Sequence, residues 1–129
     1  MKIGAVCFML LINIVIAAQQ RPIKIALLNT HISAEELNAI RAGWKQMGEG
    51  ELKTVSFADL ASSTSGFTHV WYHRTDTAAI DAEEKKAGEL FRRFVNNGGN
   101  LFLSMEAMPL LNEWNIEPAK IQFAQDTLK

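Results

Sequence analysis

The stretch that decides the fold is FVNNGGNLFLSMEAM, residues 94–108. Its first residues end a helical pattern, and the glycine pair at 98–99 follows, where a glycine can adopt the left-handed conformation that closes a helix. The run NLFLS, residues 100–104, has the length and apolar content of a buried strand. In α/β hydrolytic enzymes the exit from such a strand often carries the nucleophile. Here the exit carries Ser104 and Glu106, so it is the first place to search for chemistry.

Three further strands are predicted upstream of this unit. The segment RPIKIALLNTH contains an apolar run, Ile23 to Leu28, without polar alternation, which is typical of a strand buried on both faces of a parallel sheet. Alternation in LKTVSF predicts a second strand over 52–57, nearer an edge, and THVWYHR predicts a third over 68–74. The segment ADLASSTSG between them predicts a connection with at most one helical turn.

Helix starts are marked by capping residues. Ser33 with Glu36 three residues later forms a capping box, and helical spacing then predicts a helix over 34–47. Asp81 with Glu84 is a variant of the same signal and opens a helix that runs to about Asn96. Pro109 begins a short third helix. The last residues are indistinct, although Ile121 and Phe123 could begin another strand.

The element order β-α-β-β-α-β-α predicts an α/β three-layer sandwich with a mainly parallel, flavodoxin-like sheet. A chain of 129 residues suggests one domain, assigned to residues 22–129, and leaves open whether the sheet is complete at the C-terminus. The net charge of −1 argues against a basic surface for nucleic acid.

The first residues, MKIGAVCFMLLINIVIAAQQ, have the layout of a secretory signal: one cation, an apolar run, and small residues before a polar pair. We expect a signal peptide over residues 1–18, with cleavage after Ala17 or Ala18 and a secreted or periplasmic product. The alternative is an uncleaved membrane anchor, which is the one membrane association that the sequence suggests. Cys7, the single cysteine, lies inside this segment, so the mature chain has no thiol for a disulfide or a nucleophile.

The runs KIALLN and HVWYHR, together with LFRRFVNNGGNLFLSMEAMPLLNEWNIEP, resemble the class I glutamine amidotransferase-like superfamily. The resemblance covers about residues 22–118. It is nearest to secreted branches, related to the ThuA group, that occur alongside carbohydrate-degrading proteins. It implies a flavodoxin-like fold and a link to carbohydrate metabolism, which the residues by themselves do not indicate.

The same resemblance argues against amidotransferase chemistry. Laying LSMEAM on the family's nucleophile elbow puts Glu106 where the cysteine would be, flanked by Met105 and Ala107 and without a following glycine. The family's partner histidine comes later in the chain, whereas no histidine follows His73 in these 129 residues.

Ligands of open α/β sheets bind at the carboxyl ends of the strands, so the polar residues at the strand exits are the candidates. His73 with Ser104 could form a nucleophile–base pair, and His73 with Glu106 could act in general acid–base catalysis. The predicted ligand-binding residues are Asn29, His31, Arg74 and Asp76.

Structural roles compete with each of these assignments. His73 suits a hydrogen-bonded residue after a strand, Ser104 suits a hydroxyl bonded to backbone, and Glu106 suits a cap of the helix at Pro109. His31, His73 and Glu106 lack the spacing of a metal site, so neither a metal nor a cofactor is predicted. The three tryptophans fit core positions better than a sugar platform.

Three hypotheses follow. The first is an exported, non-catalytic α/β accessory or binding domain whose partner is a carbohydrate or another protein domain. The second is a hydrolase that uses His73 with Glu106 or Ser104. The third is the amino-terminal portion of a larger enzyme, whose partial sheet would leave an apolar edge free to pair with another copy.

Overall fold

The structure, a computed structural model, describes residues 22–116. The expected signal peptide with Cys7, and the expected strand at Ile121 and Phe123, lie outside the described residues. No helix within 22–116 combines the length and the apolar character needed to cross a bilayer. The elements are β1 (Lys24–Leu28), α2 (Ala34–Met47), β2 (Glu51–Val55), α3 (Phe57–Ser63), the 3-10 turn η1 (Thr64–Gly66), β3 (His69–Arg74), α4 (Ala82–Asn96), β4 (Asn100–Met105) and α5 (Leu110–Glu113).

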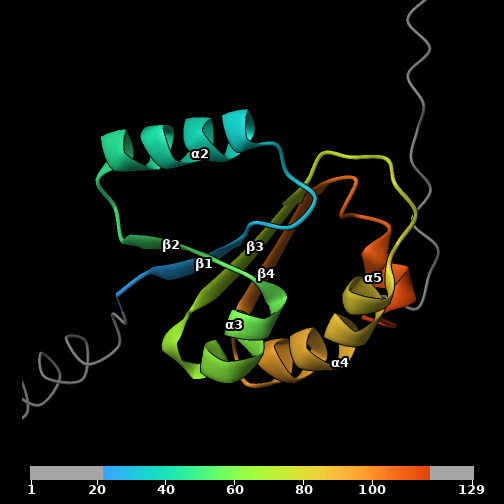
Figure 1. The fold of residues 1–129 in the computed structure, drawn as a ribbon. Coiled ribbons are helices and arrows are strands. Elements are labelled where there is room, and N and C mark those ends of the chain that lie inside the picture. The colour runs from blue at the N-terminus through green and yellow to red at the C-terminus, as the bar shows by residue number, and fades with distance from the viewer. Residues whose placement is uncertain (1–21, 117–129) are drawn as a thin grey trace, which may run out of the picture.

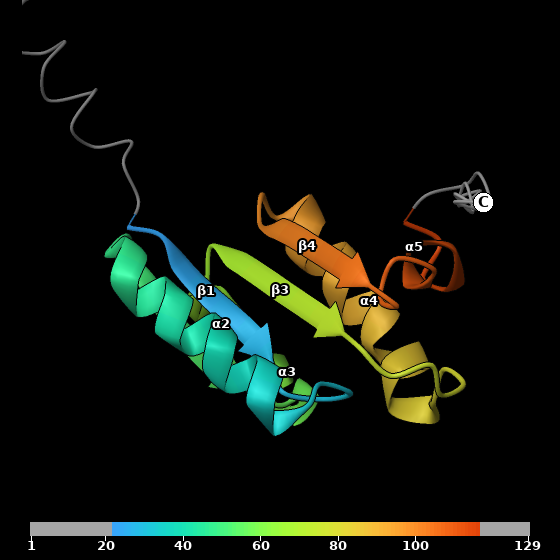
Figure 2. The same cartoon turned by 90° about the horizontal axis from the view of Figure 1, so that it is seen from above.

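The four described strands form one sheet in the order β2-β1-β3-β4, and every neighbouring pair is parallel. Figure 1 shows α2 on one face of this sheet, with α3, α4 and α5 on the other. The predicted α/β sandwich with a parallel sheet is therefore confirmed. Seen from above, α2 lies over the β1 side, while β3 and β4 have no described helix above them (Figure 2).

The main core lies between the sheet and the α3–α4–α5 layer. Its members are almost fully buried, and its aromatic rings pack edge to face, with 5.4 Å between the ring centroids of Phe57 and Tyr72 and 6.1 Å between those of Phe57 and Phe91. Strand β3 alternates between half-buried and buried residues, so Val70, Tyr72 and Arg74 point into this layer.

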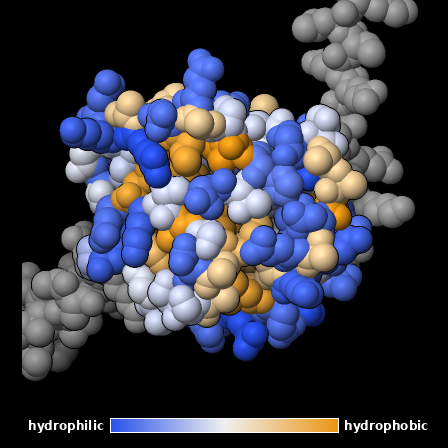
Figure 3. Space-filling model, in the orientation of Figure 1, coloured by the Kyte–Doolittle hydropathy of each residue, from blue (hydrophilic) through white to orange (hydrophobic). Residues whose placement is uncertain are grey.

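The α2 side is packed more loosely. Leu37, Ile40 and Trp44 recur on the inner face of α2, as their spacing predicts, but α2 buries none of its residues completely. Hydrophobic residues are accordingly still visible in the band between α2 and α3 on the face drawn in Figure 3. The layer on this side of the sheet is thus partial.

The segment after β2 is the main departure from the sequence prediction. Phe57 does not continue the strand but begins α3, a helix of seven residues followed by a 3-10 turn. Ser56 and Asp59 form a complete capping box at its start, and Phe57 and Leu60 are buried on its inner face. The prediction of at most one helical turn was wrong. The small polar residues after Leu60 suggest a loop, but burial of Phe57 and Leu60 against the core stabilises the helix.

The helix that precedes β4 forms as its signals predict. Asp81 and Glu84 make both bonds of the capping box of α4, and Gly98 has φ 83°, the left-handed conformation expected after the helix. The helix α4, bounded by these signals, leads into β4, which pairs with β3 and has Phe102 in register with Trp71.

Two helical glycines test the packing of the core. A Cβ at Gly88 in α4 would lie 2.5 Å from Cδ1 of Trp114, whose indole N–H is held by the carbonyl of Glu84. We expect Gly88→Ala to lower the free energy of unfolding by about 1–3 kcal/mol through overpacking. Gly43→Ala in α2, where a Cβ meets nothing within 4 Å, should raise it by up to about 1 kcal/mol. Urea denaturation measures both, and equal effects of the two variants would contradict this packing.

Candidate functional site

A cluster of charged side chains joins the carboxyl ends of β1 and β3. His31 follows β1 with φ 58°, and its carbonyl accepts the N–H of Thr75 after β3. Its ring lies between two carboxylates, with Nδ1 2.6 Å from Asp76 Oδ2 and Nε2 3.0 Å from Asp81 Oδ2. The imidazole thus ties the loop after β1 to the loop between β3 and α4.

The buried member of the cluster is Glu84, whose side chain is 0% exposed. Its Oε1 accepts the hydroxyl of Tyr72 at 2.5 Å and Nε of Arg74 at 2.9 Å, and its Oε2 accepts the backbone N–H of Asp81 at 2.9 Å. Arg74 also donates to the carbonyls of Asp76 and Ala78. The buried charges are therefore paired and saturated with hydrogen bonds.

Electrostatics set the protonation of this cluster. Burial lowers the pKa of His31, but hydrogen bonds to Asp81 and Asp76 and the charge of Glu84 outweigh it, so the pKa is raised overall. The pKa of Asp76 is lowered, chiefly by its bond to His31, and that of Asp81 chiefly by backbone N–H groups of α4 and then by His31. Burial, with the adjacent Glu84, raises the pKa of Tyr72 and keeps its hydroxyl protonated.

The ligand atoms of His31, Asp81 and Glu84 lie within 4.8 Å of one another, which is close enough for one cation. The set His31, His73 and Glu106 is not brought together in this way. Each atom of the close set already has a partner, since His31 bonds both aspartates and Glu84 bonds Tyr72 and Arg74. As it stands, the arrangement is a network of ion pairs that fixes two loops.

A second group lies on the face of β3 and β4 that no described helix covers. Nδ1 of His73 is 2.7 Å from Oγ of Ser104, and the indole N–H of Trp71 donates to the same oxygen at 2.9 Å. The Trp71 ring also packs edge to face against Phe102, with 5.7 Å between ring centroids, and Phe102 is 59% exposed. An aromatic pair and a serine–histidine pair thus share one open surface.

The charge of this group also affects a carboxylate on α2. The pKa of Glu36 is lowered, first by hydrogen bonding with Thr75 and Ser33 and in part by the nearby charge of His73. No carboxylate of residues 22–116 forms an ion pair with His73 within 4.0 Å. In the described part of the chain, the Ser104–His73 pair therefore lacks the carboxylate hydrogen bond that completes a catalytic triad.

The residues predicted for the site separate into two groups. His31, Arg74 and Asp76 meet in the charged cluster, with Arg74 also 3.3 Å from Asp76 Oδ1, whereas His73 and Ser104 meet on the open face. Asn29 is exposed and joins neither group through its side chain, although its backbone N–H donates to the carbonyl of Val55.

Two of the structural roles predicted for these residues were wrong. Ser104 bonds the side chains of Trp71 and His73 rather than backbone, because β4 aligns it in register with His73. Glu106 does not cap the last helix: the N-cap of α5 is Pro109, without a side-chain cap bond, and the backbone N–H of Glu106 donates to the carbonyl of Arg74.

Sequence reasoning missed the central role of Glu84 and Tyr72. Asp81 and Glu84 were recognised only as caps of α4, and Tyr72 only as a strand residue. The available signal was the placement of Tyr72 and Arg74 on one face of a strand, since residues two apart point the same way. An arginine on the buried face of a strand requires a buried acid opposite it.

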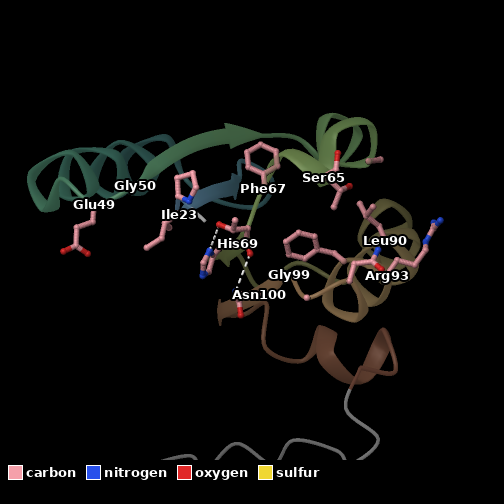
Figure 4. Close-up of a pocket in the computed structure, with 17 residues that line it drawn as sticks. Ile23, Glu49, Gly50, Ser65, Phe67, His69, Leu90, Arg93, Gly99 and Asn100 are labelled. Carbon is pink, nitrogen blue, oxygen red and sulfur yellow. Dashed lines mark hydrogen bonds between the residues drawn. The ribbon is translucent and has the colours of Figure 1, made fainter. Parts of the chain in front are cut away.

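One concavity of the described residues lies away from the predicted carboxyl edge. A pocket opens at the amino-terminal edge of the sheet, where Ile23, Phe67, His69, Arg93 and Asn100 line it (Figure 4). None of the residues predicted for catalysis or ligand binding lines this pocket.

Comparison of the chain with protein families, with curated proteins and with solved structures finds no match.

The buried ion pair can be tested against an exposed pair on the same helix. Glu84→Gln removes the buried charge opposite Arg74 and leaves it only the half-exposed Asp76, so we expect the free energy of unfolding to fall by about 3–5 kcal/mol. Glu89→Gln removes the partner of the exposed Arg92 and should change it by no more than about 1 kcal/mol. Urea denaturation of both variants measures the difference, and a small effect of Glu84→Gln would refute the central role of this pair.

His31 predicts a specific dependence of stability on pH. Its pKa is raised in the folded chain above the ordinary 6.5, so its contribution is fully present below pH 6.5 and is lost as pH rises through the raised value. Asp76 and Asp81 have lowered pKa values, so their contribution is present above the ordinary 3.8 and is lost as pH falls through the lowered ones. We expect stability to decline above neutrality, and His31→Gln to flatten that decline. Identical slopes in the two proteins, measured by denaturation between pH 5 and 9, would rule out this role.

Proposed function

We propose that the chain is an exported, non-catalytic α/β binding domain that acts in envelope or extracellular carbohydrate metabolism. Export rests on the signal-like residues 1–18, and the link to carbohydrate rests on the resemblance to secreted amidotransferase-like branches. The observation that carries the binding role is the open aromatic and polar surface on β3 and β4.

The engagement of the candidate catalytic groups supports a binding role. Asp76 is bonded to His31 and Arg74, in a different group from the His73–Ser104 pair. Ser104 Oγ accepts the indole N–H of Trp71 in addition to its bond with His73. Such an oxygen is oriented by two partners, and Asp76 lies in a separate group from the His73–Ser104 pair.

The composition of the open surface suits a sugar. Phe102 presents an exposed ring beside Trp71, and the polar groups of His73 and Ser104 lie next to these rings. A pyranose ring has an apolar C–H face and a rim of hydroxyls, so an aromatic surface with adjoining hydrogen-bonding groups matches both. Binding sites in general combine apolar contact area with a few polar groups that orient the ligand.

The carbohydrate proposal is tested by retention on a panel of insoluble polysaccharides. Phe102→Ala should weaken binding by about tenfold or more, because it removes the central exposed ring. Met47→Ala is the matched control, since Met47 at the end of α2 is 63% exposed and lies away from β4. Failure of the chain to bind any polysaccharide, or equal losses in the two variants, would overturn the proposal.

The second candidate function is a hydrolase that uses Ser104 as nucleophile and His73 as base, which the 2.7 Å contact favours. A serine-reactive fluorophosphonate distinguishes the two candidates. The binding proposal expects no adduct at Ser104 by mass spectrometry. An adduct that disappears in Ser104→Ala and His73→Ala would establish the hydrolase instead.

A further inference from the structure

Strand β4 borders the described sheet and pairs with β3 on one side only. The backbone N–H groups of Asn100 and Glu106 donate to the carbonyls of Thr68 and Arg74, so even-numbered residues direct their N–H groups toward β3. Met105, with φ 59°, ends the strand, and its carbonyl accepts the N–H of Met108. Because backbone groups alternate along a strand, those of Leu101 and Leu103 point away from the sheet. No strand of residues 22–116 pairs with them.

The two borders of the sheet differ in chemistry. Strand β2, at the opposite border, carries the exposed charges of Glu51 and Lys53, which protect an edge from pairing with other chains. Strand β4, with the sequence NLFLSM, has neither a charged residue nor a proline, and it exposes Phe102 and Met105 at 59% and 64%. Of the two borders, β4 is the one built to accept another strand.

We infer that β4 pairs with β4 of a second copy of this chain, antiparallel, about a two-fold axis at Leu103. An isologous contact requires a surface that is complementary to itself. With Leu103 opposite Leu103 of the second copy, the outward backbone groups of the two Leu103 residues bond each other, and Leu101 lies opposite Met105 of that copy, at the end of the strand. The two four-stranded sheets become one continuous sheet.

This register also matches the side chains. Phe102 lies opposite Ser104 of the second copy, both on the uncovered face, and the pairing is reciprocal. Glu106, the first charge after the strand, lies opposite the neutral Asn100. No like charges face each other along the paired strands.

Pairing would also join the two open faces. A two-fold axis perpendicular to the sheet keeps the same face of both copies on one side, so Trp71 and Phe102 of each copy contribute to one surface between the two α2 helices. The inference rests on the backbone and charge of β4 and does not depend on the carbohydrate proposal.

Cysteine cross-linking tests the partner and the register together. In the full-length chain with Cys7→Ser, residues 102 and 104 of opposite copies would lie about 4.5 Å apart between Cα atoms, within the range of a disulfide. A mixture of Phe102→Cys and Ser104→Cys chains should therefore cross-link several times more efficiently than either alone. A mixture of Met47→Cys with Ser104→Cys is the control. Cross-linking no better than this control would overturn the inference.

Light scattering at increasing protein concentration supplies a second measurement. The chain should reach twice its monomer mass, Phe102→Lys should remain monomeric, and Met47→Lys should still dimerise. Phe102→Lys with Ser104→Glu should restore the dimer through cross-strand ion pairs. A monomer at every concentration would refute the pairing of β4 with a second copy. In the unsubstituted protein, hydrogen exchange at Leu101 and Leu103 should slow as concentration rises, and concentration-independent exchange would also refute it.

Discussion

The buried carboxylate of Glu84 is the interaction on which the rest of the structure depends. It receives the hydroxyl of Tyr72 and the guanidinium of Arg74 from the central strand β3, and so fixes α4 against the sheet. The same residue accepts the indole N–H of Trp114 at its backbone carbonyl, which positions α5. A charge that is fully removed from water is tolerated only with such partners, so the position of each of these elements constrains the others.

His31 extends this constraint to the neighbouring strand β1. Its ring bridges Asp76 and Asp81, which lie on either side of the loop that leads into α4, and thereby holds the exit of β1. His31, Asp76 and Asp81, which lie at the carboxyl edge where an enzyme of this architecture has its active site, are thus bonded to one another. This is the physical reason to look for function on the open half of the sheet, since α2 lies over the β1 side (Figure 2).

The open face and the open edge are separate features of the same two strands. The face carries Trp71, Phe102, His73 and Ser104, whereas the edge carries backbone groups and no charge. A ligand on the face and a second copy at the edge can therefore coexist. Their combination would extend a small aromatic surface into a longer one, as suits a polymer rather than a small molecule.

The sequence by itself determined where the strands and the two long helices lie and that the strands form a parallel sheet. Apolar runs, helical periodicity and capping residues are local signals. Ser33, Asp81 and Gly98 mark helix ends without reference to the rest of the chain. Only the tertiary structure decided which polar residues meet. Strand order and register placed His73 beside Ser104 and left Asn29 apart from both groups. Glu84, which the sequence indicates only as a capping residue, is also buried and paired with Arg74. Such contacts join residues 10 to 50 positions apart, so no local pattern records them.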